Sequence, residues 1–417
     1  MRFAAFWLAL LPFSVVVFAQ TAAERVDIEP LIAEAMRRNP EIRAAQKKYE
    51  AASQRPAQER ALPDPTVGFG WNSSGNPLPG AGLGTEPVAN IGMMVSQEVP
   101  YPGKLRLRAE IASKEAEADA QEYRATALGV ISRLKQAYHR LHHAYEMADL
   151  LELNRELLRS LLRTAEARYS VGKAPQADVF RAQTQLTLLE TRLVQFEREK
   201  KSRTAEINSL LNRPADIPLG RPRDTTVEPL DVTVEDLLAK ARAAAPSLAR
   251  EQKMVERAGS ALNLARKDNY PDIVVNGGVY SMGSMPVMYM FRADVKLPVH
   301  RAKIRAEITE RTQSEEEAKR SYETAARSLE YRVRDDYAAV ETAQKLMNLY
   351  QGTLVPQARL TTESSLAAYS TGTADFSSVL AGYVAAIEYE MGYHEQIQEF
   401  HLALARLEEV TGVRLSH

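Results

Sequence analysis

The sequence predicts a mainly α-helical protein with a small β part, built from two similar halves. The Tyr-Ser-Val-Gly motif of residues 169–172 returns in the second half as Tyr-Ser-Thr-Gly at 369–372. Long stretches with apolar residues spaced by threes and fours predict helices, and two pairs of alternating runs predict four strands. A repeat of this length is half of the molecule built twice, rather than a short solenoid unit.

The duplication divides the chain into structural repeats over 20–213 and 233–413, joined by a Pro-rich linker over 214–232. Each repeat is expected to hold one β-hairpin, at 66–98 in the first and at 273–297 in the second. Short helices are predicted before the first hairpin, over 28–38 and 40–61.

Long helices complete both repeats, and their predicted ranges are about 103–168, 175–211, 303–369 and 375–411. The first contains no proline, and a seam that includes Leu134, Tyr138 and Leu141 is expected to be buried. A helix of ~65 residues reaches roughly 100 Å, which is too long for a compact domain. Pro356 should kink the third helix or end one of its hydrogen-bonded stretches.

The first 19 residues are predicted to be an export signal. Arg2 supplies the positive start, residues 3–18 are apolar, and Val17-Phe18-Ala19 fits a cleavage site. No later run reaches the ~20 apolar residues of a membrane-spanning helix. We therefore expect the mature chain to leave the cytoplasm without a membrane helix.

Composition excludes several classes of function. The 417 residues include no cysteine, which rules out disulfides and thiolate metal ligands. The net charge is −1, without the basic excess of a nucleic-acid-binding surface. The sequence holds no nucleophile elbow, metalloprotease helix or phosphate-binding loop, so neither an enzyme nor a cofactor is predicted.

The last predicted strand has two chemically different faces. Its apolar face includes Tyr289 and Phe291, whereas Arg292, Asp294 and Lys296 occupy the opposite face. Two hairpins cannot close a barrel or bury both sheet edges alone. One chain by itself therefore leaves sheet edges unpaired.

Tandem halves of helix, hairpin, very long helix, glycine-marked turn and returning helix resemble the TolC-type outer-membrane efflux channels. The similarity covers essentially the whole mature chain. Its most specific signs are the Asn-Pro-Glu start at 39–41, the two Tyr-Ser-x-Gly turns and the duplication. The Gln-Glu-Val-Pro-Tyr-Pro-Gly-Lys-Leu segment at 97–105 looks most like the branch that serves heavy-metal efflux pumps.

The resemblance implies a homotrimer in the outer membrane that extends into the periplasm. Four strands from each chain would form a 12-stranded transmembrane β-barrel, with Arg292, Asp294 and Lys296 facing its lumen, and the long helices would form a coiled-coil barrel. The implied partners are outer-membrane lipid, a periplasmic adaptor and an inner-membrane pump of the proton-driven RND type. Nucleic acid is not among them.

The resemblance also assigns roles at the far helical tips. Gly172 and Gly372 would mark the tips that meet the adaptor. An acid at Asp178 would bond to Tyr369 and hold the inner aperture shut. The family's arginine partner falls at Ala374, so that salt bridge is absent.

The acidic ring of the family's constriction falls in the second returning helix. Its aspartate positions correspond to Ser378 and Ala381 in this chain. The acidic gate is therefore missing, or Asp375 replaces it one turn earlier.

Two clusters leave metal binding open. His139, His142 and His143 can place two imidazoles on one helix face, but a metal site from these three residues alone would lack a carboxylate or thiol partner. Met282, Met285, Met288 and Met290 surround the second hairpin turn and would suit soft Cu(I) or Ag(I), or simply pack there.

Other functions remain for this sequence. A periplasmic coiled-coil adaptor or tether without a pore would explain the helices. It would not explain why apolar and charged residues alternate at 287–297. If the protein is a duct, three classes of cargo remain open: heavy-metal ions, organic drugs and secreted protein.

Overall fold

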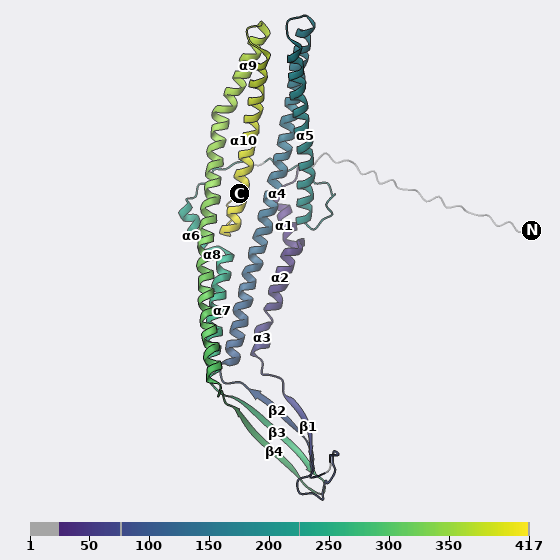
Figure 1. Cartoon of the computed structure of the whole chain (residues 1–417), viewed down its shortest axis with the longest axis vertical. Helices are drawn as coiled ribbons and strands as arrows, with labels where there is room; N and C mark the ends of the chain where they lie inside the picture. The colour runs from purple at the N-terminus through teal and green to yellow at the C-terminus, as the bar shows by residue number, and fades with distance from the viewer. Residues whose placement is uncertain (1–24, 76, 225, 416–417) are drawn as a thin grey trace, which may run out of the picture.

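A computed structural model describes residues 25–75, 77–224 and 226–415. The predicted export signal at 1–19 lies outside these residues. The molecule is elongated: two pairs of antiparallel helices extend from one side of a small sheet and end in two separate tips (Figure 1). No helix within the described residues is both long enough and apolar enough to cross a lipid bilayer.

The first repeat opens with α1 (Ile28–Arg38), α2 (Pro40–Ala52) and α3 (Arg55–Arg60). The Asn39 side chain caps α2 by accepting the N–H groups of Glu41 and Ile42 at 2.9 and 3.1 Å. The predicted single helix over 40–61 was wrong, because it breaks at residues 53–54. Pro56 lacks the N–H needed to continue α2, so it starts a new helix instead.

The remaining helices are α4 (Lys104–Ser170), α5 (Gln176–Leu210), α6 (Val234–Ala244), α7 (Pro246–Lys267), α8 (Arg301–Leu349), α9 (Val355–Thr371) and α10 (Phe376–Thr411). A short π-helix, η1 (Tyr350–Leu354), separates α8 from α9. It ends two residues before Pro356, where the sequence predicts an interruption. A wider turn accommodates the missing N–H without ending the rod.

The core is distributed along the helices rather than gathered in one centre. Leu134, Tyr138 and Leu141 of the predicted α4 seam are buried with Ile207 of α5. A second cluster near the tips combines both repeats, with Val179 of α5 packed among residues of α10. Apolar seams therefore hold the four long helices together along their length.

The sheet joins the two repeats. It contains β1 (Thr66–Asn72), β2 (Asn90–Val99), β3 (Asp272–Met282) and β4 (Met285–Lys296), all antiparallel in the order β1-β2-β3-β4. The central β2–β3 pairing connects strands from different halves. Among the described residues β1 and β4 each have one paired edge, so the sheet is open on both sides.

One face of the sheet is apolar and exposed. Phe69, Tyr289 and Phe291 are 81%, 79% and 78% exposed. On the other face the Tyr280 ring lies over Gly92 and Gly278, where an added Cβ would approach Tyr280 atoms to 2.6 and 2.7 Å. The glycines thus make room for an aromatic ring, and the large exposed apolar face indicates a non-aqueous neighbour.

Candidate functional sites: junction, sheet face and helical tips

The 97–105 segment forms the junction between sheet and helices. Lys104, the first residue of α4, is buried and pairs with Asp268 at 3.1 Å and Asp272 at 3.0 Å. Asp272 also accepts the Tyr101 N–H at 2.7 Å. The Tyr101 ring stacks on Tyr270 at a centroid distance of 4.5 Å. These contacts connect the start of α4 to the start of β3.

The charged face of β4 forms a local network. Arg292 Nε and Asn276 Nδ2 donate to the Asp294 carboxylate at 3.1 and 2.8 Å. Lys296 pairs with Glu98 of β2 at 2.8 Å. The three predicted lumen residues therefore lie on one face, and their charges are largely paired within it.

Both helical tips end in the same backbone motif. Gly172 and Gly372 have φ angles of 72° and 83°. At the first tip, the N–H groups of Gly172 and Lys173 donate to the carbonyls of Tyr169 and Arg168 at 2.9 and 2.8 Å. The second tip repeats these bonds. This is a Schellman motif, whose positive φ explains glycine at both positions.

The two tip tyrosines have different surroundings. Tyr369 is 4% exposed, whereas Tyr169 is 46% exposed. Arg168 of the first tip donates to the Tyr369 carbonyl, and its guanidinium carbon lies 4.3 Å from the centre of the Tyr369 ring. A cation over an aromatic face is attractive, so this contact holds the two hairpins of one chain together.

Asp178 is buried beside this contact, in the first turn of α5. Its carboxylate accepts from Arg181 at 3.4 Å. The Tyr369 hydroxyl has no hydrogen-bond partner among the described residues. Burial raises the pKa of Tyr369, the Arg168 charge opposes that rise, and the Asp178 charge adds to it. Asp178 and Tyr369 thus interact electrostatically in a single chain without a hydrogen bond between them.

The predicted constriction residues lie at the start of α10. Asp375 and Ser378 are exposed, and the Ser378 N–H donates to the Asp375 carbonyl at 3.1 Å. Asp375 is the N-terminal cap residue, although its side chain makes no capping bond. Both side chains are therefore accessible in the single chain.

Arg168 is the tip residue that sequence analysis missed. The family resemblance places its arginine at position 374, which is an alanine in this chain. The guanidinium instead comes from the other repeat, one position before Tyr169. Ala368 occupies the equivalent place in the second half. This difference between the two copies of the motif marks Arg168 in the sequence as a residue specific to the first tip.

The metal-ligand candidates fall in different places. Met282 and Met285 are opposite each other across the second hairpin turn, and Met288 and Met290 lie on the charged face of β4. His139, His142 and His143 lie on α4, where two further histidines from α10 join them.

A duplicated helical rod carrying an open sheet with an exposed apolar face defines a membrane-associated assembly protein. The sequence profile of the outer membrane efflux proteins matches residues 31–213 and 237–412. The chain belongs to this family, and it is therefore a non-enzymatic efflux duct of the outer membrane that extends into the periplasm.

Several solved channels share the fold. The chain is similar to CusC (15% identity, 95% of each chain covered, TM-score 0.79). It is also similar to VceC from Vibrio cholerae (16% identity, 93% of this chain and 97% of that chain, TM-score 0.79). MtrE from Neisseria gonorrhoeae is similar in its open state (20% identity, 93% and 89% covered, TM-score 0.74). No curated protein sequence is a significant match.

Proposed function

We propose that three copies of this chain form the exit duct of a tripartite efflux system. The open sheet carries the proposal, because pairing β4 of one copy with β1 of the next would close a 12-stranded barrel and remove every free edge. The apolar face would then contact lipid, and Arg292, Asp294 and Lys296 would line a wet lumen. Removal of the export signal at 1–19 would precede assembly.

Disulfide cross-linking tests this closure, since the chain has no cysteine of its own. Phe69→Cys on β1 is combined in turn with Tyr289→Cys, Phe291→Cys and Val295→Cys on β4. Oxidation in outer membranes should give a covalent trimer for at least one pair. Phe69→Cys with Met93→Cys is the control, because these residues are opposite each other within one chain. Failure of every β1–β4 pair to link two chains contradicts the barrel.

Partners of the duct follow from the two ends of the rod. We propose that the tips marked by Gly172 and Gly372 dock a periplasmic adaptor, which connects the duct to an inner-membrane pump of the proton-driven RND type. Tyr169 and Val171 are exposed at the first tip, as an uncovered docking surface requires. The repeats at 20–213 and 233–413 would contribute alternating hairpins to the ring of tips, and the linker at 214–232 would pack around its middle.

The aperture would open by separation of the tip helices. In this proposal Asp178 and Tyr369 form the latch, while Asp375 and Ser378 line the constriction. Single-channel conductance of Asp178→Ala should exceed that of wild type, whereas Glu190→Ala, an exposed acid on the same helix, should leave it unchanged. A conductance equal to wild type for Asp178→Ala removes this residue from the latch.

Heavy-metal ions are the cargo we propose, on the similarity of the 97–105 segment to the metal-efflux branch. Methionine sulfur on the charged face of β4 suits soft monovalent ions. The test is rescue of a strain that lacks its own ducts, by this chain with its pump and adaptor. Restored tolerance of copper or silver salts supports the proposal, and restored tolerance of organic dyes alone assigns drugs instead.

A further inference from the structure

Five of the chain's seven histidines surround one cavity of about 180 Å³ between α4 and α10. They are His139, His142 and His143 of α4, and His394 and His401 of α10. The helices come from different repeats, so the cluster exists only in the folded chain. None of these side chains belongs to the tips, the sheet or the junction.

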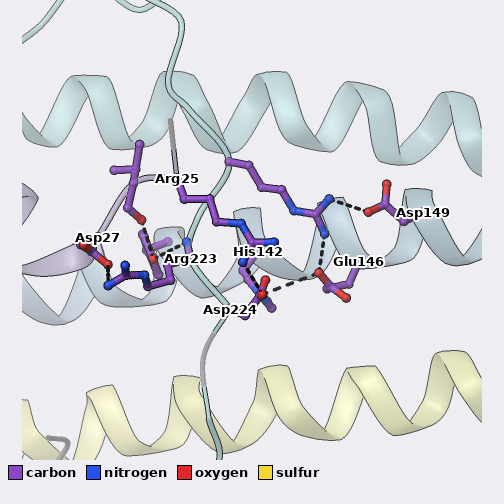
Figure 2. Close-up of polar contacts among 10 residues, drawn as sticks. Arg25, Asp27, His142, Glu146, Asp149, Arg223 and Asp224 are labelled. Atoms are coloured by element: carbon purple, nitrogen blue, oxygen red, sulfur yellow. Dashed lines mark hydrogen bonds and ion pairs between the residues drawn. The ribbon is translucent and has the colours of Figure 1, made fainter. Parts of the chain in front are cut away.

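Two carboxylates complete the cavity wall. Glu146 lies one turn after His142 on α4, and Asp224 comes from the linker segment that crosses this helix (Figure 2). His142 Nε2 is 3.9 Å from a Glu146 oxygen and 4.0 Å from an Asp224 oxygen. One ligand atom from each residue lies within 4.8 Å of the other two. A single ion can be placed among these atoms.

Several imidazole nitrogens in this cavity have no hydrogen-bond partner among the described residues. They are His139 Nδ1, His142 Nε2, His143 Nε2 and His401 Nε2. His401 is only 9% exposed. A buried polar atom left unpaired costs about 1–3 kcal/mol, so these four atoms favour a polar occupant of the cavity, either water or a metal ion.

The histidine rings pack closely around the cavity. The rings of His139 and His401 stack in parallel, with their centroids 4.2 Å apart. An imidazole coordinates a metal ion through the lone pair of a ring nitrogen.

We propose that this cavity is a binding site for a divalent first-row transition metal ion, with Zn²⁺ as its reference ligand. His142, Glu146 and Asp224 would be ligands, and His394 would supply a fourth from α10. Imidazole and carboxylate without thiolate suit Zn²⁺, Ni²⁺ or Cu²⁺ rather than soft monovalent ions. The site is therefore chemically distinct from the methionines of β4, and the inference does not depend on the cargo.

The surrounding arginines leave room for the ion. Arg221 pairs with Glu146 at 2.6 Å but also with Asp149 at 2.5 Å, so it keeps a partner if Glu146 turns to the metal. Arg25 pairs with one Asp224 oxygen, while the other oxygen faces His142. The Asp224 side chain is 60% exposed, and the linker can approach α4 by the roughly 1 Å that zinc coordination distances require.

Occupancy would connect three parts of the chain. The ligands come from the first repeat, the linker and the second repeat, so the ion would fix α10 and the linker against α4. His142 lies near the middle of α4, the helix that runs from the sheet end to the first tip (Figure 1). A metal there would stabilise the folded chain in proportion to its affinity.

Calorimetric titration with Zn²⁺ tests the site on the assembled, tag-free protein in detergent after treatment with a chelator. We expect one Zn²⁺ per protomer. Asp224→Asn and His142→Ala should each weaken the affinity about tenfold or more. Asp231→Asn, an exposed linker acid, and His300→Ala, an exposed histidine before α8, are matched controls and should bind as wild type does.

Absence of Zn²⁺, Ni²⁺ and Cu²⁺ binding to the wild-type protein overturns the proposal. Wild-type affinity in both Asp224→Asn and His142→Ala does so as well. If His142→Ala does not assemble, the exposed Asp224→Asn decides alone. Thermal unfolding gives a second readout: at one fixed Zn²⁺ concentration, the rise in Tm should be similar for the wild type and His300→Ala and smaller for Asp224→Asn. None of these outcomes depends on conductance or on transport.

Discussion

The ammonium group of Lys104 lies 3.0 Å from the carboxylate of Asp272, and only 4% of the lysine side chain is exposed. The pair joins the first residue of α4 to the first residue of β3. The 97–105 segment therefore has a structural role in this chain: it fixes the helical rod to the sheet.

Replacing Lys104 with Met should destabilise this junction by about 2–4 kcal/mol, because the carboxylates of Asp268 and Asp272 lose their shared cation in a partly buried site. Thermal unfolding followed by circular dichroism measures the effect. Lys345→Met is the control, since the Lys345 side chain is 69% exposed in its pair with Glu341. Equal Tm values for the two variants would show that the junction does not need the ion pair.

Arg168→Ala should loosen the contact between the two tips. The lost cation–π contact with Tyr369 is worth about 0.5–2 kcal/mol, and the arginine bond to the tyrosine carbonyl is lost as well. Single-channel recordings should show higher conductance or more frequent opening. Arg163→Ala, an exposed arginine of the same helix, should behave as wild type does. If Arg168→Ala has the conductance and opening frequency of wild type, the contact contributes to packing of the tips but not to closing the aperture.

Gly172→Ala should strain the first tip, because a residue with a Cβ pays about 1–2 kcal/mol at positive φ. Amide hydrogen exchange at residues 169–174 should become about fivefold faster or more. Asn tolerates this backbone region, so Gly172→Asn should be closer to wild type. If both variants exchange at the wild-type rate, the motif does not limit local opening.

Tyr138 should make the attachment of the linker sensitive to alkaline pH. Its hydroxyl donates to the Val26 carbonyl at 2.8 Å and accepts the Arg223 N–H at 3.0 Å. Burial raises the pKa of Tyr138 to about 12. Because the folded value exceeds the unfolded one, the stabilisation is complete below about pH 10 and declines as pH rises toward 12.

Tyr138→Phe tests this prediction by comparison with wild type at two pH values. At pH 8 the variant should be about 1–2 kcal/mol less stable, because Val26 and Arg223 lose a buried partner. At about pH 11 the gap should narrow, since only the wild type has this hydroxyl to ionise. The other tyrosines are present in both proteins, so their ionisation cancels from the difference in stability. A gap that is constant with pH would contradict the assignment.

Local patterns in the sequence were sufficient for most of the fold. Alternation located all four strands, and the glycines at 172 and 372 located both tips, because each depends on the backbone geometry of a few neighbouring residues. The expected single helix over 40–61 was wrong, because the missing N–H of Pro56 divides that segment into α2 and α3. The family resemblance added the expected neighbours of the sheet, which are further copies of the chain and lipid.

The candidate sites depended more on distant contacts. His394 and His401 are two turns apart, so they share a face of α10. The helical spacing in the sequence was enough to show that these two side chains are neighbours. Their meeting with His142 and Asp224 required the helices and linker to pack in one particular register. Arg168 and Tyr369 likewise come from separate repeats.

The sequence by itself determined the duplication, the helix and strand pattern, the tips and the two-faced strands, since these follow from spacing along a few turns or residues. Tertiary structure decided which repeat supplies the partner of Tyr369 and which histidines share a cavity. Which of these residues meet depends on the register in which the long helices pack against each other. The apolar seams set that register, and the spacing of residues within one helix does not encode it.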